Sequence, residues 1–257
     1  NPTWSFYYRH LISALKNDYH VIAPDHIGCG LSDKPGEDAY SFTLKQRIED
    51  LEQLVDHLSL DRKITLVLHD WGGMIGMGFA VRNPEKISRL IITNTAAFHL
   101  PENKSVPFVL SLCRDYKIGA FLVQGLNAFS RGAVRLCCHR HRMPGDVRQA
   151  YLAPYNNWHN RLAVLKFVQG IPLITSDDGY DIVTNTQNNL SKFLTIPTLI
   201  LWGAKDFVFD DHFLSKWQHY LPQASVHRFS DAGHYLLEDA HEEITPLIKQ
   251  FLLSNPN

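Results

Sequence analysis

Three residues combine side-chain types with a chain order that could support covalent catalysis. Asp70, Asp206 and His234 each follow an apolar run with the composition of a β-strand. Covalent hydrolysis needs a nucleophile, a base and a group that orients the base, and these residues can supply the three roles. Because the carboxyl ends of parallel strands meet at one edge of a sheet, we expect the three side chains to converge there.

Asp70 lies where a strand pattern changes into a helix pattern. Ile64–Leu68 is apolar, Gly72 and Gly73 follow Asp70, and Met74–Val81 is helical in composition. The side chain at the apex of a strand–turn–helix is exposed at the sheet edge, close to the N-terminal amides of the helix. The alternative is that Asp70 only caps the helix, since Asp is a common N-cap residue.

An aspartate nucleophile determines which reactions are possible. Its carboxylate needs no base, and it suits displacement of a leaving group from an sp3 carbon, which gives an alkyl-enzyme ester. His234, oriented by Asp206, would then activate water against that ester. Asn94 follows the next strand along the chain, but its amide cannot serve as the charged partner of a histidine, which favours Asp206.

The elements that must position these residues alternate between strand and helix patterns, which implies a parallel sheet with helices on both faces. Strands are predicted at 19–23, 64–68, 87–92, 198–203 and 225–229. Helices are predicted at 4–15, 41–60, 74–81, 211–220 and 244–252.

Between residues 96 and 190 helical segments replace the strand signal. They cover 107–115, 120–138, 144–153 and 157–169. We therefore expect a core formed by 1–95 and 191–257, with a helical cap at 96–190. Some apolar residues of the cap could line a pocket, although each could equally belong to the cap's own core. They are Phe98, Phe108, Leu122, Phe129, Trp158 and Phe167.

The turn around Asp70 resembles the nucleophile elbow of the α/β-hydrolase superfamily, in the branch where aspartate replaces serine. The sequence His69-Asp70-Trp71-Gly72 is typical of haloalkane dehalogenases and overlaps with epoxide hydrolases. The resemblance implies an α/β-hydrolase fold with a mostly parallel sheet flanked by helices and a helical cap inserted after the sixth strand.

The resemblance also implies how a leaving group would be held. In haloalkane dehalogenases the residues matching Asn1 and Trp71 bind the departing halide, and their backbone amides form the oxyanion hole. Trp71 could instead be a packing residue. Epoxide hydrolases use two cap tyrosines, and the tyrosines of this cap keep that alternative open. They are Tyr116, Tyr151 and Tyr155.

Three cap segments are similar to the β-lactone decarboxylases of bacterial long-chain olefin synthesis. They are Asn94–Pro101, Ala153–Trp158 and Phe167–Leu173. This similarity implies that Asp70 opens a cis-3,4-dialkyl β-lactone and that loss of carbon dioxide leaves a cis-alkene. Haloalkane dehalogenase is the alternative prediction. A catalytically inactive receptor on the same fold is a third reading, and the complete triad argues against it.

Composition limits the possible partners and location. The net charge is −1 with no basic stripe, so nucleic acid is an unfavourable partner. Four irregularly spaced cysteines and no apolar run of membrane-spanning length predict a cytoplasmic protein with an apolar small-molecule substrate. The resemblance implies peripheral association with a membrane and with other enzymes of olefin synthesis.

We expect no cofactor and no metal. Cys137-Cys138-His139 lacks a second ligand pair for zinc, and Ser176–Gly179 lacks the later ligands of a calcium loop. Gly28 and Gly30 lack the third glycine of a dinucleotide loop.

The chain begins at Asn1-Pro2-Thr3, whereas related sequences have a core strand ending in His-Gly-Asn-Pro-Thr. We therefore expect the native protein to carry further strand residues before Asn1.

Overall fold

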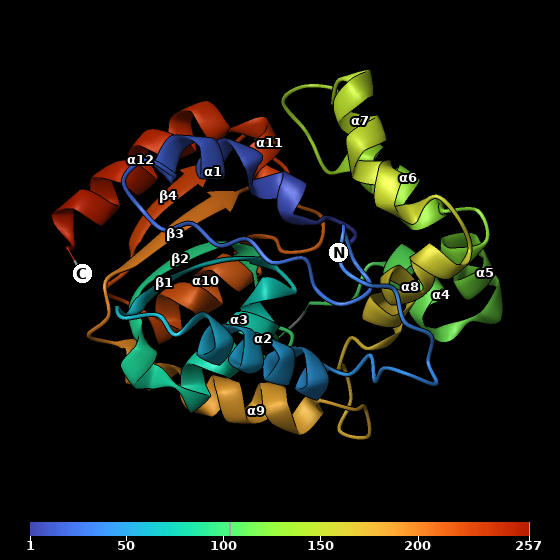
Figure 1. Ribbon diagram of the computed structural model, residues 1–257, viewed down its shortest axis with the longest axis horizontal. Helices are drawn as coiled ribbons and strands as arrows, with labels where there is room; N and C mark the ends of the chain where they lie inside the picture. The colour runs from blue at the N-terminus through green and yellow to red at the C-terminus, as the bar shows by residue number, and fades with distance from the viewer. Residues whose placement is uncertain (103, 257) are drawn as a thin grey trace.

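The computed structural model describes residues 1–102 and 104–256, and these form a parallel sheet between two helical layers with a helical cap at one side (Figure 1). The strand order is β1-β2-β3-β4, and each neighbouring pair is parallel. The strands are β1 (Ile64–Asp70), β2 (Ile87–Thr95), β3 (Thr198–Gly203) and β4 (Ser225–Phe229). The predicted parallel sheet flanked by helices is confirmed, with strands at four of the five expected positions.

Helices cover both faces of the sheet, which explains why all six residues of β3 are buried. Above the sheet in Figure 1 lie α1 (Arg9–Leu15), α11 (Leu236–Asp239) and α12 (His241–Ser254). Below it lie α2 (Leu44–Leu58), α3 (Gly72–Arg82), α9 (Tyr180–Asn188) and α10 (Asp211–Tyr220). Short 3-10 turns occupy Ser5–Tyr8, Pro84–Lys86, Ala153–Tyr155, His159–Arg161 and Leu190–Phe193.

The sheet separates two apolar clusters that hold the helices in place. The cluster below the sheet includes Ile48, Phe79, Ile92, Trp202 and Trp217. The cluster above it includes Tyr7, Leu11, Leu201, Tyr235 and Ile248. Burial of each such side chain stabilises the fold by about 1.5–3 kcal/mol.

The connection between β1 and α3 is too tight for ordinary side chains. A Cβ atom on Gly73 would lie 2.1 Å from Thr95 Oγ1 and 2.4 Å from the carbonyl oxygen of Ala96. A Cβ atom on Gly76 would lie 2.4 Å from Leu68 Cδ2, whereas one on Gly72 would meet nothing within 4 Å. Gly73 and Gly76 therefore allow α3 to begin directly against β1 and β2.

The cap is built from five short helices. They are α4 (Phe108–Asp115), α5 (Lys117–Gln124), α6 (Ala128–Leu136), α7 (Gly145–Leu152) and α8 (Leu162–Gln169). The predicted single helix at 120–138 is wrong, because Asn127 adopts a left-handed backbone with φ of 54° between α5 and α6. Arg161 Nη1 donates to the carbonyls of Gln124 and Gly125 at 2.9 Å each, which satisfies the end of α5 without continuing the helix.

The strand predicted at 19–23 is also wrong. These residues adopt no regular structure and pair with no strand among the described residues. Tyr19 and Val21 are partly buried against the cluster above the sheet. The apolar pattern of this segment therefore reflects packing, whereas a strand additionally requires a ladder partner.

Helix α9 lies within the range predicted for the cap but packs against α3 below the sheet (Figure 1). Val183 on α9 belongs to the cluster below the sheet, and a Cβ atom on Gly179 would lie 3.1 Å from Leu44 Cβ of α2. The division of the chain into a core at 1–95 and 191–257 and a cap at 96–190 stays a prediction.

In two loops, an aspartate side chain accepts hydrogen bonds from backbone amides and so stabilises the loop. Asp25 Oδ1 accepts from the amide of Ser5 at 2.6 Å, and Oδ2 accepts from that of Leu31 at 2.8 Å, around the left-handed Gly30. Asp177 Oδ2 accepts from the amides of Leu173 and Ile174, so residues 173–179 form a turn before α9.

Replacement of Gly73 by Ala should destabilise the protein by about 1–3 kcal/mol, because the new methyl group would overlap Thr95 and the backbone of Ala96. Gly72→Ala is the matched control and should change the free energy of unfolding by less than about 1 kcal/mol. Urea denaturation of both variants measures the difference. Equal effects of the two substitutions would contradict the tight contact at Gly73.

Candidate active site

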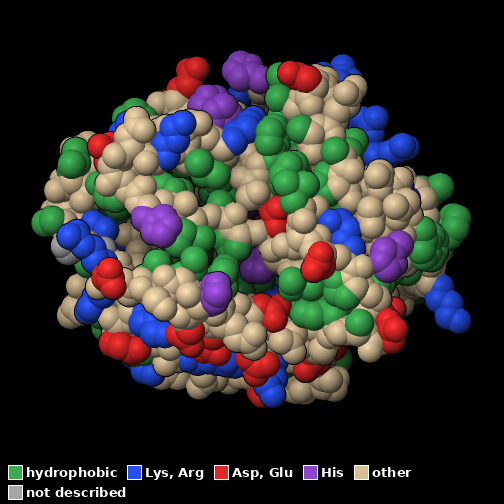
Figure 2. All heavy atoms as spheres, in the orientation of Figure 1, with side chains coloured by type: hydrophobic (Ala, Val, Ile, Leu, Met, Phe, Trp, Pro, Cys, Tyr) green, Lys and Arg blue, Asp and Glu red, His purple; other side chains and the backbone are tan. Residues whose placement is uncertain are grey.

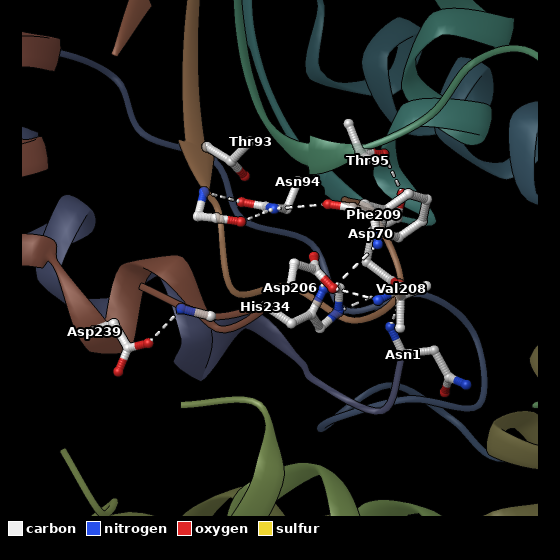
Figure 3. Close-up of polar contacts among 12 residues, drawn as sticks. Asn1, Asp70, Thr93, Asn94, Thr95, Asp206, Val208, Phe209, His234 and Asp239 are labelled. Carbon is white, nitrogen blue, oxygen red and sulfur yellow. Dashed lines mark hydrogen bonds and ion pairs between the residues drawn. The ribbon is translucent and has the colours of Figure 1, made fainter. Parts of the chain in front are cut away.

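The ends of three strands bring Asp70, Asp206 and His234 together (Figure 3). Asp70 ends β1, Asp206 follows β3 after a short turn, and His234 lies in the loop after β4. His234 Nδ1 lies 2.7 Å from Asp206 Oδ2, and His234 Nε2 lies 3.6 Å from Asp70 Oδ2. The imidazole therefore bridges two carboxylates, one on each ring nitrogen.

Asp206 is fixed by its own loop. Its Oδ1 accepts from the backbone amides of Val208 at 2.7 Å and Phe209 at 3.1 Å, which leaves Oδ2 for His234 (Figure 3). The Asp206 side chain has no exposed surface. A carboxylate held on one oxygen by two amides can orient the imidazole with its other oxygen.

Asp70 has the strained backbone of an elbow, with φ of 50°. Thr95 Oγ1 donates to the Asp70 carbonyl and accepts from the amide of Gly73 at 3.0 Å, so one hydroxyl joins both sides of the turn. The structure thus presents the Asp70 side chain toward His234 at the edge of the sheet (Figure 3).

Asp70 is ionised at neutral pH. Burial raises the pKa of this carboxyl, and the neighbouring imidazole of His234 lowers it. Burial lowers the pKa of His234, and the neighbouring carboxylates of Asp206 and Asp70 outweigh it, so the pKa of His234 is raised overall. The site therefore combines a buried carboxylate with a histidine that holds its proton more firmly than usual.

Asn1 and Trp71 both lie next to Asp70. The backbone nitrogen of Asn1 contacts Asp70 Oδ1, while its side-chain amide donates to the Val164 carbonyl of α8 at 3.3 Å. The Trp71 ring packs edge-on against Phe167 with 5.1 Å between ring centroids. Among the described residues, no acceptor is bonded to the Trp71 indole N–H.

Of the apolar cap residues predicted to line a pocket, Phe167 is the one that contacts the triad region. Its ring lies between Trp71 and the buried guanidinium of Arg47, whose Cζ is 3.5 Å from the ring centroid. Phe98 packs against Trp217 below the sheet, and the other four belong to the cap's interior or surface. Those four are Phe108, Leu122, Phe129 and Trp158.

Asn94 has a structural role. Its Nδ2 donates to the Gly203 carbonyl at 3.0 Å and its Oδ1 accepts from the Gly203 amide at 2.8 Å. The fully buried amide joins the ends of β2 and β3, close to the turn that carries Asp206.

Two residues near the triad were not singled out from the sequence. His69 stacks on Tyr7 at 4.6 Å and lies 4.7 Å from the His234 ring. Burial lowers the pKa of His69 well below its ordinary value, and the neighbouring His234 lowers it further, so His69 is neutral at pH 7. Its place directly before Asp70 was the available signal, because a residue before the elbow lies in the buried strand.

Asp239 is the second residue near the triad that was not singled out, and its carboxylate holds the loop that carries His234. Asp239 Oδ2 accepts from the amides of Gly233 at 2.7 Å and His139 at 2.8 Å, and Oδ1 accepts from that of Arg140 at 3.2 Å. The carbonyl of Cys137 accepts from the amide of Tyr235 at 2.8 Å. The segment Cys137–Arg140, considered above as a metal site, thus binds the histidine loop, and the described residues contain no group of three metal-ligating side chains.

Comparison with known proteins places this geometry in a family. A model of the alpha/beta hydrolase fold matches residues 1–241. The chain belongs to the α/β-hydrolase fold family. It is an enzyme family, and the parallel sheet flanked by helices agrees with it.

More similar relatives separate the two predicted reactions. The chain is 55% identical over 252 residues to a protein of Shewanella oneidensis named cis-3-alkyl-4-alkyloxetan-2-one decarboxylase, covering 98% of this chain and 79% of that protein. A protein of the same name from Xanthomonas campestris is 46% identical, with coverage of 100% and 87%. Haloalkane dehalogenase 2 of Mycobacterium bovis is 28% identical, with coverage of 96% and 84%. The decarboxylase interpretation is therefore better supported than the dehalogenase one.

The fold resembles solved haloalkane dehalogenases. Haloalkane dehalogenase DatA of Agrobacterium tumefaciens superposes with a TM-score of 0.86 at 24% identity, covering all of this chain and 87% of that one. At this identity the likeness concerns the fold alone. In the part of the chain that the structure describes, every helix is too short or too polar to cross a membrane.

Substitution of Asp206 by Asn should lower the pKa of His234, because the largest favourable charge on the imidazolium would be lost while burial remained. NMR titration of the His234 ring measures this pKa. Asp210→Asn is the matched control, since Asp210 pairs with Lys104 instead. An unchanged His234 pKa in Asp206→Asn would contradict the pairing.

Proposed function

We propose that this protein decarboxylates a long-chain cis-3,4-dialkyl β-lactone to a cis-alkene and carbon dioxide, with Asp70 as the nucleophile. The observation that carries this proposal is the ionised Asp70 carboxylate at the elbow, next to His234, in a chain 55% identical to a protein with that printed activity. We propose Asp206 as the group that orients His234, and Asn1 and Trp71 as the donors to the departing oxygen.

The reaction balances in two steps without added water. Asp70 attacks C4 of the lactone ring, the sp3 carbon bearing oxygen, and the C4–O bond breaks to give a free carboxylate on C3. The C3–carboxylate bond then breaks, its electron pair forms the C3–C4 double bond, and the C4–Asp70 bond breaks. Carbon dioxide and alkene leave, and the Asp70 carboxylate is regenerated.

This route also accounts for a cis product. Displacement inverts C4, and elimination proceeds with the carboxylate anti to the Asp70 ester. An inversion followed by an anti elimination keeps the two alkyl groups on the side they shared in the ring. The stereochemistry therefore follows from attack by a single carboxylate from behind the C4–O bond.

The surroundings of Asp70 suit this chemistry. The carboxylate that develops on ring opening needs hydrogen-bond donors, and Asn1 and Trp71 offer an amide N–H and an indole N–H. Phe167 on Trp71 and Phe209 on His234 offer apolar surface for alkyl chains, with centroid separations of 5.1 and 5.9 Å.

Haloalkane hydrolysis is the second candidate, because the same residues could displace halide and hydrolyse the ester. Epoxide hydrolysis is disfavoured by the cap tyrosines. The Tyr151 hydroxyl contacts Glu238, that of Tyr155 donates to the Thr3 carbonyl at 3.3 Å, and Tyr116 is exposed. A receptor without catalysis would not need the ionised elbow carboxylate.

We further propose that the enzyme is cytoplasmic, associates peripherally with membranes and works beside other enzymes of olefin synthesis. The apolar substrate and product support this, since both partition into lipid.

Full-length enzyme offered a cis-dialkyl β-lactone should release alkene and carbon dioxide, and Asp70→Ala should reduce the rate by at least about a thousandfold because the nucleophile is removed. Gas chromatography of the alkene measures this. Bromoalkane is the comparison substrate. Rapid bromide release with an inert lactone would overturn the decarboxylase proposal in favour of a dehalogenase.

The pH dependence separates the two reactions. Ester hydrolysis requires neutral His234, so bromide release would increase as pH rises through the raised pKa of that residue. Asp70 reacts as its carboxylate, and the decarboxylation route adds no water. Alkene formation should therefore change less than about threefold between pH 5.5 and 8. A rate that follows His234 deprotonation would show that His234 acts as a base in alkene formation.

A further inference from the structure

The charge of the chain is distributed unevenly. Residues 104–170, which contain helices α4 to α8, carry ten Lys or Arg and two Asp or Glu. The remaining 190 residues carry 15 Lys or Arg and 24 Asp or Glu. A nearly neutral protein thus consists of an acidic core and a strongly basic cap.

The same cap exposes large apolar side chains. The exposed fraction is 77% for Phe108, 63% for Ile118 and 53% for Phe121. Together with nearby exposed residues they form what we term the cap surface. It comprises Phe108, Val109, Ile118, Phe121, Leu126 and Trp158, with the basic residues Lys117, Arg131 and Arg135.

The cap surface is continuous across neighbouring helices. Helices α4 and α5 pack closely, because a Cβ atom on Gly119 would lie only 2.0 Å from the Leu112 carbonyl oxygen. Ile118 and Phe121 lie one turn apart on α5, and the Phe121 ring is 6.4 Å from that of Trp158. Figure 2 shows hydrophobic side chains along the right edge of the molecule, over α4 and α5, with Lys and Arg side chains above and below them.

The basic residues of the cap surface are available for an external partner. Arg131 and Arg135 lie one turn apart on α6, which packs against α5, and both are exposed. Within the described residues, Lys117, Arg131 and Arg135 form no ion pair. By contrast, Arg114 and Arg140 of the cap each contact two carboxylates.

We propose that the cap surface docks the enzyme on an anionic lipid bilayer. Aromatic and aliphatic side chains flanked by Lys and Arg suit the boundary between acyl chains and anionic headgroups. Nucleic acid fits the cap surface less well, because it would pair with the basic residues but leave the exposed apolar side chains uncovered. A second copy would offer acidic charge from its core, but the large exposed apolar residues described there are scattered. They are Ile22, Leu31, Ile174, Leu194, Phe207 and Leu253.

Docking through the cap would place helices α4 and α5 at the lipid bilayer, in which a long-chain lactone dissolves. This link to catalysis rests on the proposed function. Helix α8 connects this surface to the site, since it packs against α4 and α5 and carries Phe167, which contacts Trp71. The docked surface would thus lie one helix away from the residues around Asp70.

Vesicle flotation of the full chain tests the proposal. The protein should bind vesicles of mixed phosphatidylglycerol and phosphatidylcholine, bind phosphatidylcholine vesicles much more weakly, and dissociate at high salt. The triple variant Lys117→Gln, Arg131→Gln, Arg135→Gln should bind the anionic vesicles about 100-fold less tightly, with about fivefold lost for each charge. The variant Ile118→Ser, Phe121→Ser should also lose binding, because apolar insertion would be lost.

The double variant Lys16→Gln, Lys249→Gln is the matched control, because both residues are exposed on the core side at α1 and α12. It should change vesicle binding by less than about threefold. Absence of binding, binding unaffected by the triple variant, or equal loss in the control would overturn the proposal. A change in oligomeric mass without vesicle binding would assign the cap surface to a second copy instead.

The catalytic assay keeps this test separate from the proposed function. Alkene formation from lactone dispersed in detergent micelles should be the same in the wild type and in all three variants, because none of the substituted residues contacts the triad. Vesicle binding by a protein that leaves the lactone intact would refute the decarboxylase proposal and retain the docking surface.

Discussion

The left-handed backbone of Asp70 is the constraint on which the rest of the structure depends. A non-glycine residue in this conformation costs about 1–3 kcal/mol, and surrounding contacts must offset that cost. The hydroxyl of Thr95 supplies two of them, one to the carbonyl of Asp70 and one to the amide of Gly73. Because Thr95 ends β2, the elbow is held by the neighbouring strand of the sheet.

His234 is held in place by two aspartate side chains. Asp206 and Asp239 are both buried carboxylates that accept from backbone amides, and between them they fix the imidazole and the loop that carries it. Neutral His69 then fills the space beside His234 without adding a competing cation. The result is a largely buried site in which the imidazole lies between two carboxylates.

The sequence allowed the strand ends, the elbow and the order of the triad to be predicted, because these depend on local patterns of apolar residues and glycine. The break between α5 and α6 could not be read locally, since Arg161 caps α5 from another helix of the cap. Tyr19–Ala23 has strand composition, but ladder partners are a property of the whole sheet. Asp239 was missed because a single acidic residue in a polar stretch gives no sign that two of its partners, His139 and Arg140, are 100 and 99 positions away.

The contacts of Asp239 attach one end of the cap to the loop that carries His234. The segment Cys137–Arg140 joins α6 to α7, and it is fastened to the histidine loop by a buried carboxylate and a backbone bond. Displacement of this segment would therefore also displace the loop that carries His234. At the opposite end, α4 and α5 reach the site through α8, whose Phe167 contacts Trp71. The two ends of the cap are thus joined to different parts of the site, the histidine loop at one end and the residue after Asp70 at the other.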